Sequence, residues 1–226
     1  MKVRIIILTM LLSSRLYCMA QNEKEVLSNI AKTGKTITSF IPSGYDTIAT
    51  AKGDLNKDGR DDIVMVLYDK RDDTVSIGAE GYSRLLIVLF KTDEGWSVAI
   101  KSANIIMCKT CGGVYGDPFN QIDIKNGIIT IDHYGGSNWR WAYTNKFRYQ
   151  DGDFYLIGVT KDSYSVFGGK GCDDIGSANR DFEDINLITG QRMLLKTSED
   201  CKVELEKKDK IKKKPLVKLA DYKYDN

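Results

Sequence analysis

Short runs of apolar residues alternate with turn residues over most of this chain, and this pattern predicts a β protein. The runs are rich in β-branched and aromatic residues and recur every ~8 to 15 residues, which is typical of antiparallel strands. Consecutive runs are joined by the strong hairpin signals Asn126-Gly127 and Asp151-Gly152. We expect strands at 47–52, 63–69, 84–92, 96–103, 121–125, 128–133, 139–150, 153–161 and 192–197.

Residues 22–33 have a different period. Val26, Leu27, Ile30 and Ala31 recur at helical spacing, which predicts one amphipathic helix packed on a sheet. The successive hairpins that follow need no helical crossover. The predicted fold class is therefore mainly β: an antiparallel meander, as a sandwich, an open barrel or a partial propeller-like sheet, with one N-terminal helix.

The first 20 residues have the features of a secretory signal peptide. Basic residues precede an apolar stretch, and Cys18-Met19-Ala20 fits a small-x-small cleavage site. The apolar stretch is shorter than the ~20 residues that a membrane span needs, so we expect no transmembrane segment. Lipidation at Cys18 is the alternative, although Leu16-Tyr17 are bulky for such a site. A cleaved signal peptide and a secreted or periplasmic protein are predicted.

Two regions remain after residues 1–20: a β-rich domain at 21–201 and a lysine-rich tail at 202–226. The whole chain has 33 basic and 31 acidic residues, and lysines crowd between Lys207 and Lys214. The tail is expected to be a solvated linker or an electrostatic contact for an acidic polymer or anionic surface. The apolar residues within 216–219 are also compatible with one last strand. No nucleic-acid partner is expected, and the oligomeric state is left open.

Residues 53–62 place oxygen-bearing side chains at every second position around a glycine. Gly59 permits the positive φ of a sharp turn, and Ca²⁺ takes six or more oxygens at about 2.3–2.6 Å from such loops. An EF-hand would need Glu where Met65 stands, so this is another kind of loop. A metal-free hairpin turn is the alternative. The predicted ligands are Asp54, Asn56, Asp58, the carbonyl of Arg60, and Asp62.

This glycine-turned acidic loop leads into the apolar run 63–68. Over residues 46–68 the chain resembles the FG-GAP/VCBS repeat class, whose blades carry a motif close to D-x-N-x-D-G-x-x-D-hydrophobic. The resemblance implies a calcium loop between strands. Members of that class usually show several copies and this chain has one, so a complete propeller is not implied.

Cys108, Cys111, Cys172 and Cys201 form an even set, as expected of a protein in an oxidising compartment. Of the three possible pairings we favour Cys108–Cys111 with Cys172–Cys201. A zinc site or a thioredoxin-like redox site at 108–111 are the alternatives. Gly112-Gly113 oppose the helix that a redox motif would begin.

The aromatic segment 133–143 is the candidate ligand-binding region. Trp139, Trp141 and Tyr143 alternate along a predicted strand and would share one face, with Arg140 on the other. Such faces suit stacking on sugar rings or capture of a peptide. The alternative is that they are the buried face of the strand.

These features predict an exported, calcium-stabilised binding module for a glycan or an extracytoplasmic protein, with no catalytic residues assigned. A glycan hydrolase using Asp132 and a second carboxylate is an alternative. His133 is the only histidine, and nothing in the spacing of the acids selects a pair. An inhibitor of a secreted enzyme, with the basic tail meeting an acidic cleft, is a further alternative.

Overall fold

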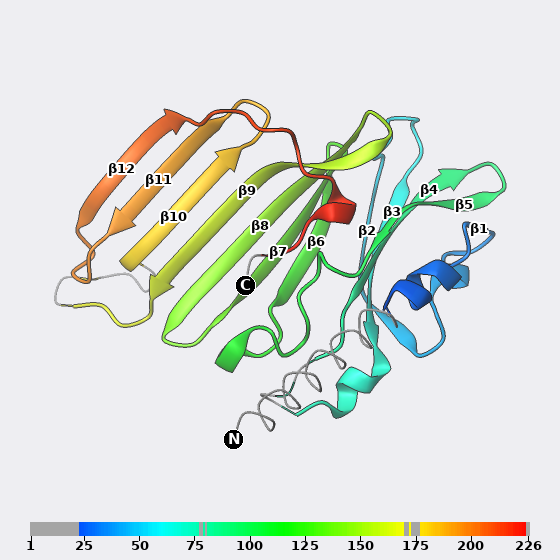
Figure 1. Cartoon of the computed structure of the whole chain (residues 1–226), viewed down its shortest axis with the longest axis horizontal. Helices are drawn as coiled ribbons and strands as arrows, with labels where there is room; N and C mark the ends of the chain where they lie inside the picture. The colour runs from blue at the N-terminus through cyan, green and yellow to red at the C-terminus, as the bar shows by residue number, and fades with distance from the viewer. Residues whose placement is uncertain (1–22, 77–78, 80, 170–171, 173–176, 225–226) are drawn as a thin grey trace, which may run out of the picture.

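The computed structural model describes residues 23–76, 79, 81–169, 172 and 177–224. The predicted signal peptide at 1–20, with Cys18, lies outside the described residues. Two antiparallel sheets make up the fold, which confirms the predicted β-rich class (Figure 1). Helical residues 23–29 occupy part of the expected N-terminal helix.

The first sheet has five strands. In spatial order these are β1 (Thr33–Gly34), β5 (Gly95–Ser102), β4 (Leu85–Thr92), β3 (Asp62–Asp69) and β2 (Tyr45–Gly53). Two short 3-10 helices, η1 (Ile37–Phe40) and η2 (Lys70–Thr74), adjoin this sheet in the chain. The predicted calcium loop joins β2 to β3.

The second sheet is a seven-stranded meander. From one edge to the other it contains β12 (Val203–Lys210), β11 (Gln191–Thr197), β10 (Ala178–Asn186), β9 (Asp153–Ser165), β8 (Trp139–Gln150), β7 (Ile128–Gly136) and β6 (Phe119–Lys125). The 3-10 helices η3 (Gly113–Tyr115) and η4 (Leu219–Asp221) lie before β6 and after β12 in the chain. All strands expected from the sequence overlap observed ones. β1, β10 and β12 were not expected.

The central strands of the five-stranded sheet, β3 and β4, are buried on both faces. Val64, Val66 and Leu86 face the seven-stranded sheet and pack with Ile131 and Phe147. The opposite face, with Met65, Leu67, Leu85, Ile87 and Leu89, packs with Ile30 and Phe40 from the N-terminal segment. Burial on both faces explains why β3 and β4 are continuous apolar runs rather than alternating ones.

Strands β10, β11 and β12 lie on the side of the seven-stranded sheet away from the five-stranded sheet (Figure 1). We call these three strands the extension. Almost all of their residues are half-buried or exposed. The extension is therefore a single layer of sheet, without the apolar cover that β6–β9 receive.

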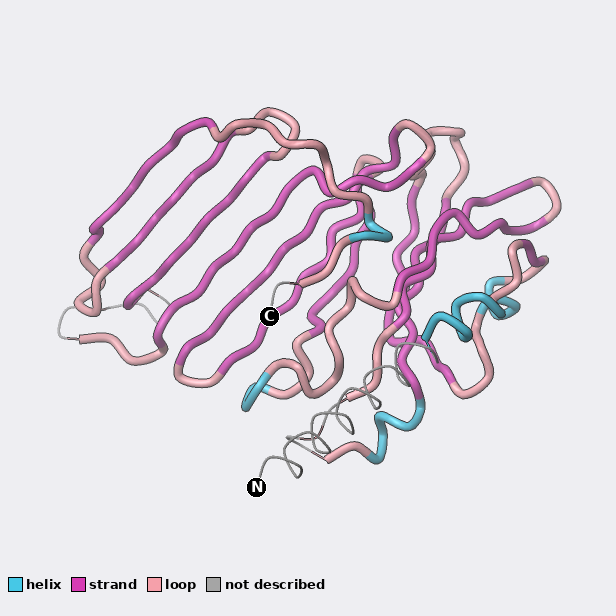
Figure 2. Tube along the Cα trace, viewed as in Figure 1, coloured by secondary structure: helices cyan, strands magenta, loops and turns pink. Residues whose placement is uncertain are grey.

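The chain after β12 crosses back over the seven-stranded sheet, as Figure 2 shows for the loop that leads into η4. Leu156 donates a backbone hydrogen bond to Val217, and Lys218 pairs with Tyr155 in an isolated bridge. Leu219 is fully buried in the core between the sheets. Residues 203–224 are thus part of the folded domain, in contrast to the solvated linker that their lysines suggest.

The dipeptides Asn126-Gly127 and Asp151-Gly152 form the hairpin turns that the sequence predicts. Asn126 and Gly127 have φ of 54° and 71°, and Asp151 and Gly152 have 51° and 80°. Positive φ at both central residues is the requirement of the type I′ hairpin, in which Asn-Gly and Asp-Gly are favoured.

Candidate binding face and calcium loop

β8 carries an aromatic platform, which we define as Trp139, Trp141 and Tyr143. The three side chains alternate along the strand and share one face, as predicted. The rings of Trp141 and Tyr143 lie 5.2 Å apart between centroids, with 31° between their planes. Trp139 is 55% exposed and the other two are half-buried. None of these three described residues belongs to either hydrophobic core, and Tyr143 also packs against Tyr224 of the C-terminal segment, with ring centroids 6.1 Å apart.

Gly135 of β7 positions the Trp141 ring. The two residues are opposite one another in the β7–β8 ladder. A methyl group at position 135 would lie only 2.4 Å from Cζ2 of Trp141. The indole therefore lies directly against the backbone of β7, in space that any other residue at 135 would fill.

Polar side chains continue the same face across β9 and β10. Lys161 lies opposite Tyr143, and Glu183 lies opposite Lys161. Ser163 lies opposite Trp141. Binding sites for polar ligands combine apolar ring faces with a few groups that fix orientation by hydrogen bonding. This face offers both kinds of group side by side.

Arg140 lies on the opposite face of β8, apart from the other three predicted ligand-binding residues. Its guanidinium lies 5.2 Å from the ring centroid of Tyr115 and donates a 3.2 Å hydrogen bond to the carbonyl of Gly136. Tyr115 in turn packs edge-on against Tyr134 at 4.8 Å between centroids. These contacts hold η3 against the β7–β8 hairpin.

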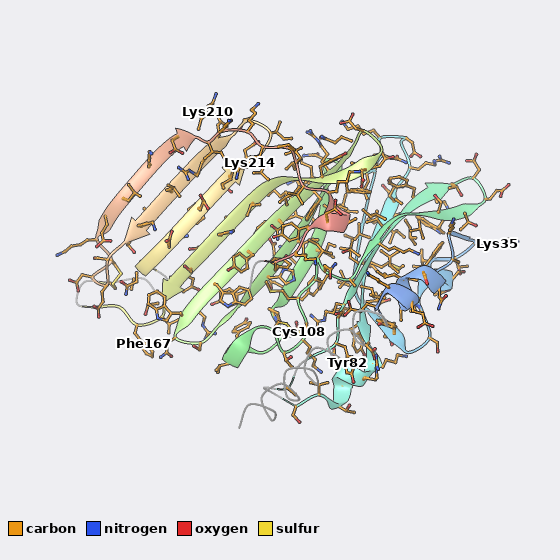
Figure 3. The ribbon with its side chains drawn as sticks, in the orientation of Figure 1. Lys35, Tyr82, Cys108, Phe167, Lys210 and Lys214 are labelled. Atoms are coloured by element: carbon orange, nitrogen blue, oxygen red, sulfur yellow. A yellow bond between two sulfur atoms is a disulfide. The ribbon has the colours of Figure 1, made fainter. Side chains whose placement is uncertain are left out.

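Two further exposed apolar side chains near this end of the sheet were not singled out from the sequence. Tyr115 is 52% exposed and Phe167 is 66% exposed. Phe167 follows the end of β9 and lies at the lower end of the sheet in Figure 3. Its neighbour Val166 donates to the carbonyl of Asn138, just before Trp139. Their signal in the sequence is a large apolar residue inside a glycine-rich loop, at 112–116 and at 167–169.

His133 is 1% exposed and fastens the C-terminal segment to β7. Its Nε2 accepts a 3.2 Å hydrogen bond from the backbone N–H of Met107, and its Nδ1 lies 2.8 Å from the Tyr224 hydroxyl. Burial, assisted by the charge of Arg84, lowers the pKa of His133 to about 4. The imidazole is therefore neutral near pH 7 and carries its proton on Nδ1.

Asp132 points to the face opposite His133, because successive side chains alternate along β7. Its Oδ2 accepts from the Gln121 amide at 2.6 Å and its Oδ1 from the Thr144 hydroxyl at 2.5 Å. Both oxygens thus join neighbouring strands. The structure does not bring Asp132 and His133 together as one acid–base unit.

The loop between β2 and β3 is turned by its own side chains. The Asp54 carboxylate accepts from the backbone N–H groups of Asp58 and Gly59, at 3.1 and 3.0 Å. Asn56 Oδ1 also accepts from the N–H of Asp58 at 3.0 Å, and Gly59 has φ of 84°. The sharp reversal expected from the sequence is therefore present.

Arg60 covers the middle of this loop. Its guanidinium donates to Asp58 Oδ2 at 2.9 Å and to Asp93 Oδ1 at 2.7 Å. The hydrogen bonds from Arg60 hold the pKa of Asp58 below its usual value. In the structure, the positive charge beside Asp58 thus comes from Arg60.

Asp62 is the buried end of the loop. It has no exposed surface, and its two oxygens accept 2.9 Å hydrogen bonds from the backbone N–H groups of Leu55 and Lys91. Burial outweighs these hydrogen bonds and raises the pKa of Asp62. The carboxylate therefore joins the loop to β4.

The predicted calcium ligands can be compared with this geometry. Within the part of the chain that the structure describes, no three His, Cys, Asp or Glu side chains are gathered as a metal site would require. A carboxylate has about four acceptor positions. Asp54 accepts two hydrogen bonds and so keeps free lone pairs, whereas Asp58 accepts four, one from the Asn56 amide and three from Arg60. A cation would need these oxygens to turn inward and Arg60 to move from Asp58.

Both predicted cysteine pairs are confirmed as disulfides. Cys108–Cys111 joins Cα atoms 5.1 Å apart, and Cys172–Cys201 joins Cα atoms 5.4 Å apart. The first closes a tight turn just before η3. The second links the segment that follows Phe167 to the turn between β11 and β12.

No protein-family model, curated protein or solved structure matches this chain. The resemblance of residues 46–68 to the FG-GAP/VCBS class therefore stays a prediction. No helix among the described residues is long and apolar enough to cross a membrane.

Proposed function

We propose that this chain is an exported, non-enzymatic binding module that binds a glycan on the aromatic platform. The observation that carries the proposal is the offset pair of Trp141 and Tyr143 beside the exposed ring of Trp139. Ring faces of this kind stack on the apolar faces of sugars, while neighbouring polar side chains bind the hydroxyl groups. Export is supported by the predicted signal peptide and by the two disulfides.

The extension is a single layer of sheet on one side of the platform, and its open face favours a ligand longer than one sugar. Lys161 and Glu183 extend the face from β8 toward the extension, and neither is in either hydrophobic core. A chain of sugars that stacked on Trp141 and Tyr143 would reach these charged groups. A protein partner is the alternative, and absence of binding by every sugar would favour it.

The test is a calorimetric titration with a panel of soluble oligosaccharides: β-1,4-linked glucose, β-1,4-linked N-acetylglucosamine and α-1,4-linked glucose. We expect one class to bind, and Trp141→Ala to weaken binding by roughly tenfold or more, because truncating a central aromatic contact costs upwards of about 1.4 kcal/mol. Tyr115→Ala is the matched control, since it removes an exposed ring from the other face. Absence of binding by every class, or equal losses in the two variants, would contradict the glycan proposal.

We also propose that Ca²⁺ stabilises the 54–62 loop through Asp54, Asn56, Asp58 and the Arg60 carbonyl, with Asp62 as the buried anchor. The support is the spacing of these oxygens and the turn that they already form. At free Ca²⁺ about ten times the dissociation constant, one site adds roughly 1.4 kcal/mol to the free energy of unfolding.

Thermal unfolding in EDTA and in added Ca²⁺ tests the calcium proposal. We expect Ca²⁺ to raise Tm and Asp58→Asn to abolish the rise. Asp61→Asn is the control, because it removes the same charge from the same loop but lies outside the ligand set. An unchanged Tm of the parent protein would refute calcium binding.

A further inference from the structure

A cavity of about 500 Å³ lies under the segment that follows β12. Val159 in its lining is two positions along β9 from Lys161, the residue opposite Tyr143. Its floor comes from β9 and from the turn between β10 and β11, and its roof is residues 211–217, which we call the strap. The apolar residues that line it are Leu156, Val159, Leu187, Ile211, Leu216 and Val217. Its volume is within the range of small-molecule sites, about 300–1,000 Å³.

The strap is held at its two ends. Ile211 donates a 2.9 Å backbone hydrogen bond to Gly190, and Val217 accepts one of 2.9 Å from Leu156. Lys218 then forms an ion pair with Asp153 at 3.0 Å. The residues between these two attachments arch over the sheet, which leaves space beneath them.

The rim of this cavity is positively charged. Lys212, Lys213 and Lys214 line it and are exposed, and none of its lining residues is acidic. Other lysines of the same segment, such as Lys207 and Lys218, form ion pairs with carboxylates. The three rim lysines form none within the described residues. Lys214 lies at the end of the sheet opposite Phe167 (Figure 3).

We propose that this cavity binds a single-chain amphiphile with an anionic head, whose alkyl chain lies under the strap and whose head meets Lys212, Lys213 and Lys214. Apolar floor and cationic rim match the two halves of such a ligand. A cationic amphiphile would be repelled by the same rim, and a neutral one would gain only the apolar contact.

Calorimetry on the full chain with monomeric dodecanoate and dodecyl phosphate tests this proposal. We expect both to bind and dodecyltrimethylammonium not to bind. Because burial of each methylene contributes about 0.8 kcal/mol, lengthening the carboxylate from ten to twelve carbons should tighten binding roughly fourfold per carbon. Failure of both anions to bind, or equal binding of the cationic probe, would overturn the proposal.

Two variants separate the rim from the cavity. Replacing Lys212, Lys213 and Lys214 together by Gln should weaken dodecanoate binding roughly tenfold, since each exposed charge contributes about 0.2–1 kcal/mol. The matched control replaces Lys35, Lys57 and Lys125, which are also exposed, and should bind like the parent. Val159→Trp should fill the cavity and abolish binding of every amphiphile. Unchanged affinity in the rim variant, with folding verified by circular dichroism, would also overturn the proposal.

Discussion

The five-stranded sheet and the extension are both antiparallel, but different interactions stabilise them. β3 and β4 are buried on both faces by apolar side chains from the seven-stranded sheet and the N-terminal segment. The extension has no such cover, and its strands are joined by cross-strand ion pairs. Arg192 binds Asp209 and Glu183, Lys196 binds Asp181, and Arg180 binds Asp162.

This difference assigns separate tasks to the two regions. Burial of apolar surface is the dominant favourable contribution to folding, whereas exposed ion pairs contribute little each. The two-layered half therefore supplies most of the stability. The extension leaves a broad sheet face open beside the aromatic platform, and the Cys172–Cys201 disulfide and the strap attach it to the rest.

The largest expected difference between the regions is in the cost of removing a side chain. Phe147 is fully buried between the sheets, so Phe147→Ala should lower the free energy of unfolding by about 3–5 kcal/mol. Leu194, which is half-buried in β11, should cost only about 1 kcal/mol when replaced by Ala. Urea unfolding of both variants measures this, and equal costs would remove the distinction between the regions.

Disulfide removal should reveal how the extension is attached. Cys172 and Cys201 are 29 positions apart, and the chain-entropy model gives about 3.6 kcal/mol for a loop of this length. The tight Cys108–Cys111 ring gives about 2 kcal/mol in the same model. Unfolding of the two double Cys→Ser variants compares them. A larger loss of stability from removing Cys108–Cys111 than from removing Cys172–Cys201 would contradict this ranking.

Acid should act on the two-layered half through His133. Its pKa is about 4 when folded and about 6.5 when unfolded, so the unfolded chain binds more protons between these values. The stabilisation is complete above pH 6.5 and is lost as pH falls toward 4, by roughly 2 kcal/mol between pH 7 and pH 5. Urea unfolding at these two pH values measures the loss. His133 is the only histidine, so a loss that persisted in His133→Gln would refute this assignment.

The smallest expected effect is that of salt on the extension. Added NaCl screens solvent-accessible, half-buried ion pairs such as Arg192–Asp209 but changes buried apolar contacts far less. Amide hydrogen exchange in β11 and β12 should accelerate with NaCl relative to exchange in β3 and β4. Asp209→Asn should give the same acceleration without salt. Uniform behaviour of all four strands would mean that ion pairs do not stabilise the extension.

The same comparison explains what the sequence could and could not predict. The strands of the two-layered half are apolar or alternating, and residues 63–69 and 128–133 were recognisable for that reason. β10 and β12 have mainly polar residues on both faces because both faces meet water. They therefore lack the period-two apolar pattern and were not predicted. β11 was predicted because it contains the apolar run Met193, Leu194 and Leu195.

Part of the candidate site could also be predicted from the sequence. Alternation along β8 predicted the shared face of Trp139, Trp141 and Tyr143. The contact of Trp141 with Gly135, and the contact of Arg140 with Tyr115, depend on which strands pair. Pairing brings together residues that local sequence patterns do not relate, so these contacts could not be predicted.

The central claim is that the aromatic platform is the ligand-contacting surface, and the three tryptophans provide a direct test. Trp139 and Trp141 belong to the platform, while Trp96 lies in the five-stranded sheet with the Lys91 ammonium 4.6 Å from its ring. In NMR spectra recorded during titration with the oligosaccharide panel, we predict that one sugar class shifts the indole N–H signals of Trp139 and Trp141 and leaves that of Trp96 unchanged. Shifts confined to Trp96, or no indole shift with any sugar, would contradict the account.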